Sequence, residues 1–193
     1  MKINRVLISA LFVAMVLVLT TFPQSYLEQQ VFIGRDVTPV TNLWLQGKVH
    51  EGDHVGYFGW VQTYPRSDGY LQIYGGPYVD VKGFQFGLGV GAERSGTFTP
   101  RYAGFISTTQ KKFFLNGNYE RSRNGQWYLV QAGIQASKRF AFSYHDQYDF
   151  GRGPRVDVGI GKGFSVYAAP LWSPTNGSGV LTGVRYSFSF PHK

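Results

Sequence analysis

A two-residue alternation between apolar and polar or small side chains constrains this chain more than any other feature. In the clearest segment, Phe84, Phe86, Leu88, Val90 and Ala92 alternate with Gly83, Gln85, Gly87, Gly89, Gly91 and Glu93. Successive side chains of a β-strand point to opposite faces, so this segment is predicted to be a strand with one apolar face and one polar face. The same alternation recurs over residues 69–81, 155–162 and 179–190. The chain is therefore predicted to be all-β.

Turn signals between the alternating segments divide the chain into about twelve predicted strands, with ten as the alternative count. The predicted strands are residues 27–34, 41–50, 54–64, 69–81, 83–93, 100–109, 112–121, 126–136, 139–147, 155–162, 164–172 and 179–190. We expect bulges where Pro77 and Pro170 interrupt strands, because proline cannot donate a ladder hydrogen bond.

The predicted connections alternate in length along the chain. Tight turns at 50–53, 82–83, 110–111, 137–138 and 162–163 alternate with mostly longer segments at 64–69, 94–99, 122–125, 148–154 and 173–178. Short turns at one rim and longer loops at the other are typical of antiparallel up-and-down transmembrane β-barrels. With twelve strands, the N-terminus and the C-terminus of the barrel lie at the same rim.

Composition agrees with a single β-domain over residues 26–193. The 25 glycines and the 17% aromatic residues favour short strands and tight turns over amphipathic helices. The mean hydropathy of -0.17 does not argue against a membrane barrel, because only alternate residues of its strands face lipid. The absence of cysteine excludes disulfides and thiolate chemistry.

The N-terminal segment, residues 1–25, has the features of an export signal. Lys2 and Arg5 precede an apolar run from Val6 to Phe22, which ends at Pro23. A charged start followed by an apolar core is typical of a signal peptide. No Ala-x-Ala cleavage site follows the run, so a retained membrane anchor is the alternative.

The final predicted strand carries a terminal aromatic pattern. Gly183, Tyr186, Phe188 and Phe190 stand as Gly-x-x-Tyr-x-Phe-x-Phe. This pattern resembles the β-signal by which bacterial outer-membrane β-barrel proteins are handed to their assembly machinery, although Leu181 stands where a polar residue is usual and three residues follow Phe190. The resemblance implies an outer-membrane location and contacts with membrane lipids and the barrel-assembly machinery. It points to no particular family.

In such a barrel the apolar faces contact lipid and the polar faces line the lumen. We expect Phe86 and Leu88 to face the bilayer and Gln85 and Gly87 to face the lumen. Aromatic residues near strand ends are expected at the membrane interfaces: Tyr57, Trp127, Tyr128, Phe140, Trp172 and Tyr186. A soluble lipocalin-like barrel, with its apolar face turned inward, is the alternative, because alternation alone does not tell inside from outside.

The residues predicted to line the lumen combine charged, amide and aromatic side chains. They are Lys48, Tyr74, Asp80, Gln85, Glu93, Arg101, Asn116, Asn118, Glu120, Gln131, Gln135, His145, Asp157 and Arg185. We expect Arg101 and Arg185 to pair with acidic members of this set. About eight strands enclose a filled interior and about sixteen an open pore, so twelve strands predict a narrow or occluded passage.

Catalytic and metal chemistry have little support in the sequence. Ser143 and His145 share the inward face of one predicted strand. Hydroxyl and imidazole together are similar to the site of lipid-hydrolysing outer-membrane barrels, but the His-x-Ser order is reversed here and no following Asn matches. Asp146 would face the other way, so no orienting group is in place. We predict no metal and no cofactor.

The leading functional hypothesis is a narrow channel or transport pore for small polar solutes. The alternative is a structural or adhesion barrel in which basic loop residues bind anionic lipid or glycan. The loop residues in question are Arg66, Arg94, Arg121, Arg123, Arg152 and Arg155. A lipid-modifying enzyme and a soluble ligand-binding barrel are further alternatives. Although the formal charge is +8, the basic residues are scattered, which argues against a nucleic-acid partner.

Overall fold

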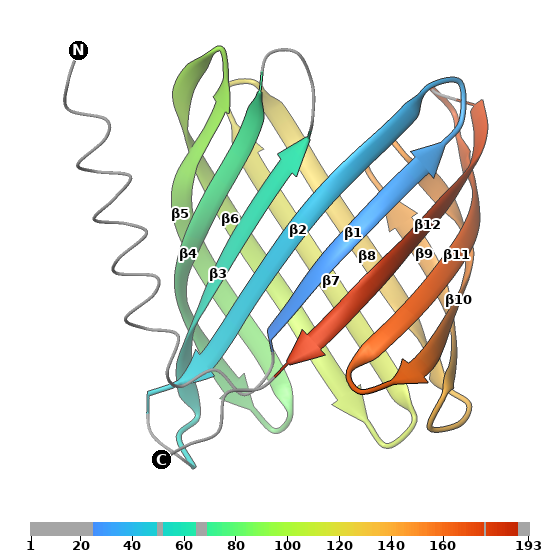
Figure 1. Ribbon diagram of the computed structural model, residues 1–193. Helices are drawn as coiled ribbons and strands as arrows, with labels where there is room; N and C mark the ends of the chain where they lie inside the picture. Colours follow the sequence, from blue (N-terminus) through green and yellow to red (C-terminus); the bar gives the residue numbers. More distant parts are fainter. Residues whose placement is uncertain (1–24, 50–51, 65–68, 176, 189–193) are drawn as a thin grey trace.

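The computed structural model describes residues 25–49, 52–64, 69–175 and 177–188, which form a closed antiparallel barrel of twelve strands (Figure 1). The strands are β1 (Ser25–Ile33), β2 (Val37–Lys48), β3 (Val55–Tyr64), β4 (Tyr70–Val81), β5 (Phe84–Ser95), β6 (Thr97–Gln110), β7 (Phe113–Ser122), β8 (Gly125–Gln135), β9 (Phe140–Gln147), β10 (Gly151–Gly161), β11 (Phe164–Ser173) and β12 (Gly177–Phe188). The twelve-strand prediction is confirmed. Residues 1–24 of the predicted signal segment, residues 1–25, lie outside the described residues, whereas Ser25 already belongs to β1. The described residues contain no helix that could span a membrane.

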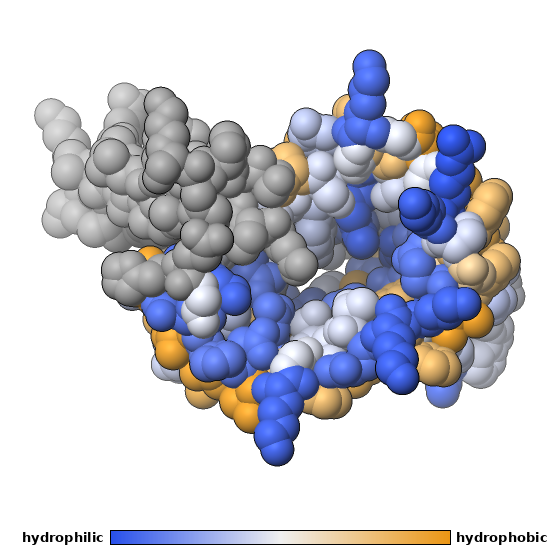
Figure 2. All heavy atoms as spheres, turned by 90° about the horizontal axis from the view of Figure 1, so that it is seen from below, coloured by the Kyte–Doolittle hydropathy of each residue, from blue (hydrophilic) through white to orange (hydrophobic). Residues whose placement is uncertain are grey.

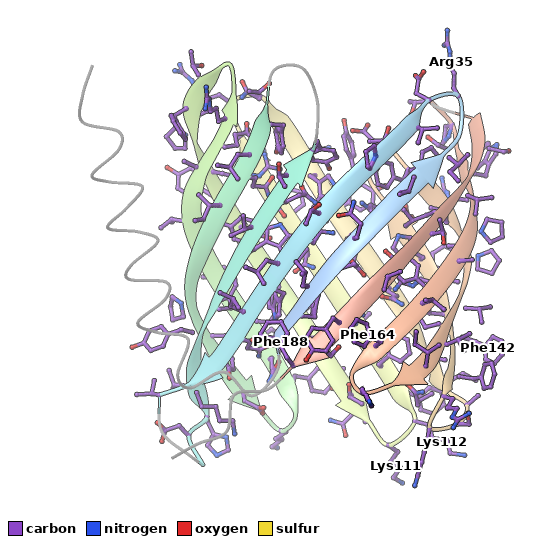
Figure 3. All side chains as sticks on the ribbon, viewed as in Figure 1. Arg35, Lys111, Lys112, Phe142, Phe164 and Phe188 are labelled. Carbon is purple, nitrogen blue, oxygen red and sulfur yellow. The ribbon has the colours of Figure 1, made fainter. Side chains whose placement is uncertain are left out.

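The barrel closes by pairing its first strand with its last. The register runs from Ser25 opposite Phe188 to Ile33 opposite Val180, and each other strand pairs with its neighbours in sequence. Both ends of the barrel therefore lie at one rim, as the even strand count predicts. We call this end the terminal rim. The other end, which carries the β1–β2 connection with Arg35, is the distal rim (Figure 3).

The predicted alternation of side chains is confirmed. Leu88 is 76% exposed on the outer face, whereas Gly87 and Glu93 on the same strand are buried inside. Aromatic side chains such as Phe142 project outward from the wall (Figure 3). The lipocalin-like alternative, with its apolar faces turned inward, is not what the structure shows. The interior does contain large aromatic residues, but the outer wall is predominantly apolar, as contact with lipid requires.

The connections do not show the predicted contrast between short turns and long loops. Strands extend into segments expected to be loops: only Gly96 separates β5 from β6, and β10 begins at Gly151. The connections contain two to six residues at the terminal rim and one to five at the distal rim. At the terminal rim, Lys82 with Gly83 and Lys162 with Gly163 have positive φ values, which is the conformation of tight type I′ hairpin turns.

The expected bulges at the two strand prolines are absent. The register of β4 with β5 is the same on both sides of Pro77, and that of β11 with β12 is continuous through Pro170. The irregularity lies instead in β10, between Gly159 and Gly161, where the register with β11 shifts. Glycine tolerates such a bend without a side-chain clash, and Gly161 has a φ of 103°.

Most of the predicted interface aromatics face outward, but Trp127 does not. Tyr57, Phe140, Trp172 and Tyr186 are exposed, and Tyr128 is half-buried. Trp127 is buried inside the barrel because it shares the inward face of β8 with Gln131. An indole near the end of a strand can belong to either face, and only the strand register decides which.

Candidate functional site: the barrel lumen

A buried ion-pair cluster joins three neighbouring strands inside the barrel. Arg101 on β6 forms ion pairs with Glu93 on β5 and with Glu120 on β7, the second at 2.7 Å. All three side chains are predicted lumen residues, and the acidic partners expected for Arg101 are the ones that it contacts. The antiparallel registers bring them together, since each occupies an inward position on an adjacent strand.

Neutral side chains also donate hydrogen bonds to the carboxylates of Glu93 and Glu120. The Tyr74 hydroxyl donates to Oε1 of Glu120 at 2.8 Å, and Gln72 Nε2 donates to Oε2 at 2.5 Å. The Ser122 hydroxyl donates to Oε1 of Glu93 at 2.5 Å. Buried charges are stable only when paired and hydrogen-bonded, and this cluster meets both conditions. It fixes one side of the lumen as a rigid polar surface.

A second charged cluster lies on the opposite side of the closed barrel from the first. Arg185 on β12 contacts Oε1 of Glu28 through Nε at 3.0 Å and Nη2 at 2.7 Å. Arg155 on β10 binds Asp157 through two hydrogen bonds of 2.9 and 2.6 Å and lies 4.0 Å from Glu28. The Arg155 guanidinium also stacks 3.5 Å above the ring of Tyr167. The cluster therefore pairs each arginine with a carboxylate.

Two members of this second cluster, Glu28 and Arg155, were not among the predicted lumen residues. Glu28, the partner of Arg185, was absent from the predicted lumen because its strand shows no regular alternation: Glu28, Gln29 and Gln30 are three successive polar residues. Arg155 was assigned to a basic outer loop because Gly151, Gly153 and Pro154 read as turn residues. The structure corrects this assignment: β10 begins at Gly151, and Arg155 is buried inside the barrel.

Aromatic side chains occupy much of the lumen on the side of β1 to β6. Trp44, Phe58 and Phe105 pack together, with the rings of Trp44 and Phe105 edge-to-face at 5.2 Å between centroids. Trp60 meets Trp44 edge-to-face at 5.8 Å, and Tyr26 meets Trp60 in the same way at 6.4 Å. This aromatic wall was not predicted from the sequence. It narrows the lumen well below the width that twelve strands alone would leave.

Two cavities remain between the aromatic wall and the polar residues. The terminal cavity, of about 450 Å³, reaches Ser25 and Phe188 at the terminal rim. The distal cavity, of about 770 Å³, reaches Arg35 at the distal rim. Both contact Gln62 and Trp127, so these two side chains mark the boundary between the cavities. Seen from the terminal rim, hydrophilic residues surround a hollow and hydrophobic residues lie on the outside (Figure 2).

Three of the predicted lumen amides line the terminal cavity, namely Asn116, Asn118 and Gln131. Gln85 faces inward and accepts a hydrogen bond of 2.8 Å from Gln46. Gln135 differs from the prediction: it is exposed at the terminal rim, where its amide donates to the carbonyls of Ser137 and Phe140. Its position at the end of β8 makes it part of a turn and not of the lumen wall.

The remaining predicted lumen charges also lie close to the terminal rim. Lys48 is half-buried at the end of β2. Asp80 is half-buried and accepts a hydrogen bond of 3.0 Å from the backbone N–H of Gly83. This contact gives Asp80 a structural role in the β4–β5 turn.

Ser143 and His145 face the lumen as predicted, but each binds a glutamine. Ser143 Oγ accepts a hydrogen bond of 3.0 Å from Gln131, and His145 Nε2 lies 3.1 Å from Oε1 of Gln147. Asp146 points the other way, toward the Tyr128 hydroxyl at 3.3 Å. Nucleophilic catalysis needs a hydroxyl bonded to a base and a base bonded to an orienting group, and the hydrogen bonds of these residues do not form that chain. The described residues contain no metal-binding cluster of three or more His, Cys, Asp or Glu side chains.

The fold and the polar lumen together define the class of protein: the chain has the fold of outer-membrane β-barrels. Neither a protein-family model nor a curated protein sequence matches it. Among solved structures it is similar to the KdgM porin, with a TM-score of 0.61 and 13% identity over 85% of this chain and 99% of that one. It is also similar to outer membrane phospholipase A from Escherichia coli, with a TM-score of 0.51 and 9% identity over 88% and 91% of the two chains. At such identities the likeness extends to the fold alone.

Proposed function

We propose that this barrel is a narrow passage for small polar solutes across the outer membrane. The observation that carries the proposal is the pair of cavities, which open toward opposite rims and share Gln62 and Trp127. A structural barrel with a solid core needs no such space. Charged and amide side chains lining a passage can replace the water that a polar solute loses on entry.

The similarity to a porin supports the same proposal at the level of fold. The KdgM porin has also been solved in complex with disordered oligogalacturonate, and that structure matches this chain with a TM-score of 0.57. A barrel of this fold can therefore bind a polar chain molecule. In the present barrel the aromatic wall and Trp127 occupy part of the lumen, which favours small solutes.

Conductance across a planar lipid bilayer tests the proposal. Purified barrel, shown to be folded by its heat-modifiable migration on a denaturing gel, should produce discrete current steps. Trp127→Ala removes a large side chain from the boundary and should increase the step size. Val130→Ala on the outer face of the same strand is the matched control, since Val130 is 39% exposed and contacts neither cavity. Folded barrel without any conductance would refute the proposal, and a structural or adhesion role would replace it.

A further inference from the structure

The terminal cavity is lined by both aromatic and hydrogen-bonding side chains. Tyr26, Trp44, Trp60 and Phe105 supply aromatic surface from β1, β2, β3 and β6. Asn116, Asn118, Ser107 and Gln131 supply amide and hydroxyl groups from β6, β7 and β8. In the closed strand order, β1 and β2 lie half a turn from β7 and β8. Because Asn42, Gln46 and Gln62 also line the cavity beside the rings of β2 and β3, a molecule inside it meets aromatic rings and hydrogen-bonding groups together.

The charged groups at the cavity are already neutralised by one another. Arg185 is bound to Glu28 at 2.7 Å, and Arg155 is bound to Asp157 at 2.6 Å. A charged solute would have to compete with these contacts, because each arginine holds a carboxylate at hydrogen-bonding distance. The cavity is therefore better suited to bind an uncharged ligand than an anion or a cation.

Some of the amide groups remain available for a ligand. Asn118 lines the cavity, and its side chain forms no hydrogen bond with the described residues. Gln62 donates to Asn42 at 2.9 Å through its nitrogen, which leaves its carbonyl oxygen without a donor among the described residues. Amides both donate and accept, so their natural partners are hydroxyl groups, which do the same.

From this arrangement we infer that the terminal cavity is a binding site for uncharged saccharides of one or two rings. A sugar ring has an apolar C–H face, which packs on aromatic side chains, and a rim of hydroxyl groups, which hydrogen-bond to amides. The volume of about 450 Å³ is at the small end of the range for ligand pockets. The inference rests on the proposed passage, because it names the class of solute that the passage admits.

Intrinsic tryptophan fluorescence measures this binding without any need for conduction. Of the four tryptophans, Trp44, Trp60 and Trp127 line the cavity, whereas Trp172 is 54% exposed on the outer wall. Titration of the barrel in detergent micelles with galactobiose should give saturable quenching. Digalacturonate, which differs by a carboxylate in place of each hydroxymethyl group, should bind at least tenfold more weakly.

Asn118→Ala tests the amide groups of the cavity, because it removes an amide that contributes no hydrogen bond to the described fold. It should raise the dissociation constant for galactobiose about fivefold, the effect of losing one neutral hydrogen bond. Gln126→Ala is the matched control, since Gln126 lines only the distal cavity and its loss should leave binding unchanged.

The two proposals fail separately. Absence of quenching, equal affinity for the acidic disaccharide, or an unchanged dissociation constant in Asn118→Ala would overturn the saccharide site even if the barrel conducts. Saturable quenching by a barrel that does not conduct would instead leave the site standing and refute the passage.

Discussion

Removal of the Arg101 guanidinium should strongly destabilise the barrel. Arg101 is the ion-pair partner of both Glu93 and Glu120, whose exposed fractions are only 2% and 1%. Arg101→Met keeps much of the side-chain volume but leaves two buried carboxylates without a cation. Breaking a buried ion pair by deleting one partner costs about 3–5 kcal/mol. The neutral donors on the carboxylates remain in the variant, and they cannot replace the lost charge.

The free energy of unfolding can be measured by urea titration of the barrel in lipid vesicles, with tryptophan fluorescence as the signal. We expect Arg101→Met to lose about 3–5 kcal/mol. The triple variant Arg101→Met, Glu93→Gln, Glu120→Gln removes all three charges and should recover most of that loss, because replacing a whole buried ion cluster by neutral groups is often close to neutral.

Two results would refute this reasoning. A loss below about 1 kcal/mol in Arg101→Met would mean that water reaches the carboxylates, as in a surface ion pair. A triple variant no more stable than Arg101→Met would mean that packing, and not charge, is the contribution of Arg101. In either case the cluster would not be the rigid polar surface described above.

Three further predictions concern the lipid-facing side of the barrel, the charged side chains of the lumen and the location of the barrel in the membrane. Leu88→Arg should cost about 2–4 kcal/mol in vesicle unfolding because it places a cation in lipid, whereas Gln85→Arg should be tolerated; equal effects would reverse the assigned faces. Arg185→Ala should shift the reversal potential toward cations, since Glu28 loses its closest cation, and Asp157→Ala should shift it toward anions by releasing Arg155; no change would place these groups away from the ion path. The unheated barrel in the membrane fraction should migrate differently from the boiled protein on a denaturing gel, and identical migration would contradict a membrane barrel.

The strands were predictable because their side-chain alternation is regular. In β5 every second residue from Phe84 to Ala92 is apolar, so the strand and its apolar face follow from the sequence, although alternation alone does not decide whether that face is turned outward. The ion pairs of Arg101 were likewise accessible, because its acidic partners occupy alternating positions on adjacent strands. Tertiary structure added little to these predictions beyond the strand register.

The interior was less predictable where local composition was ambiguous. Gly153 and Pro154 resemble a turn, so the strand that carries Arg155 inward was predicted to begin too late. At Trp44 and Leu45 two successive apolar residues conceal which one faces inward. The aromatic wall follows from packing between strands distant in sequence, such as the contact of Trp44 with Phe105. No pattern within one strand contains that information.

Modification of a single cysteine at the boundary between the cavities tests whether the two cavities form one continuous passage. The chain contains no cysteine, so Gln62→Cys introduces a unique reactive group where the terminal and distal cavities meet. A small, membrane-impermeant methanethiosulfonate reagent, added to either side of a planar bilayer, should reduce the current through this variant. Val130→Cys, on the outer wall, should show no change. Reaction of Gln62→Cys from one side only, or an unchanged current after reaction, would contradict a continuous passage through the barrel.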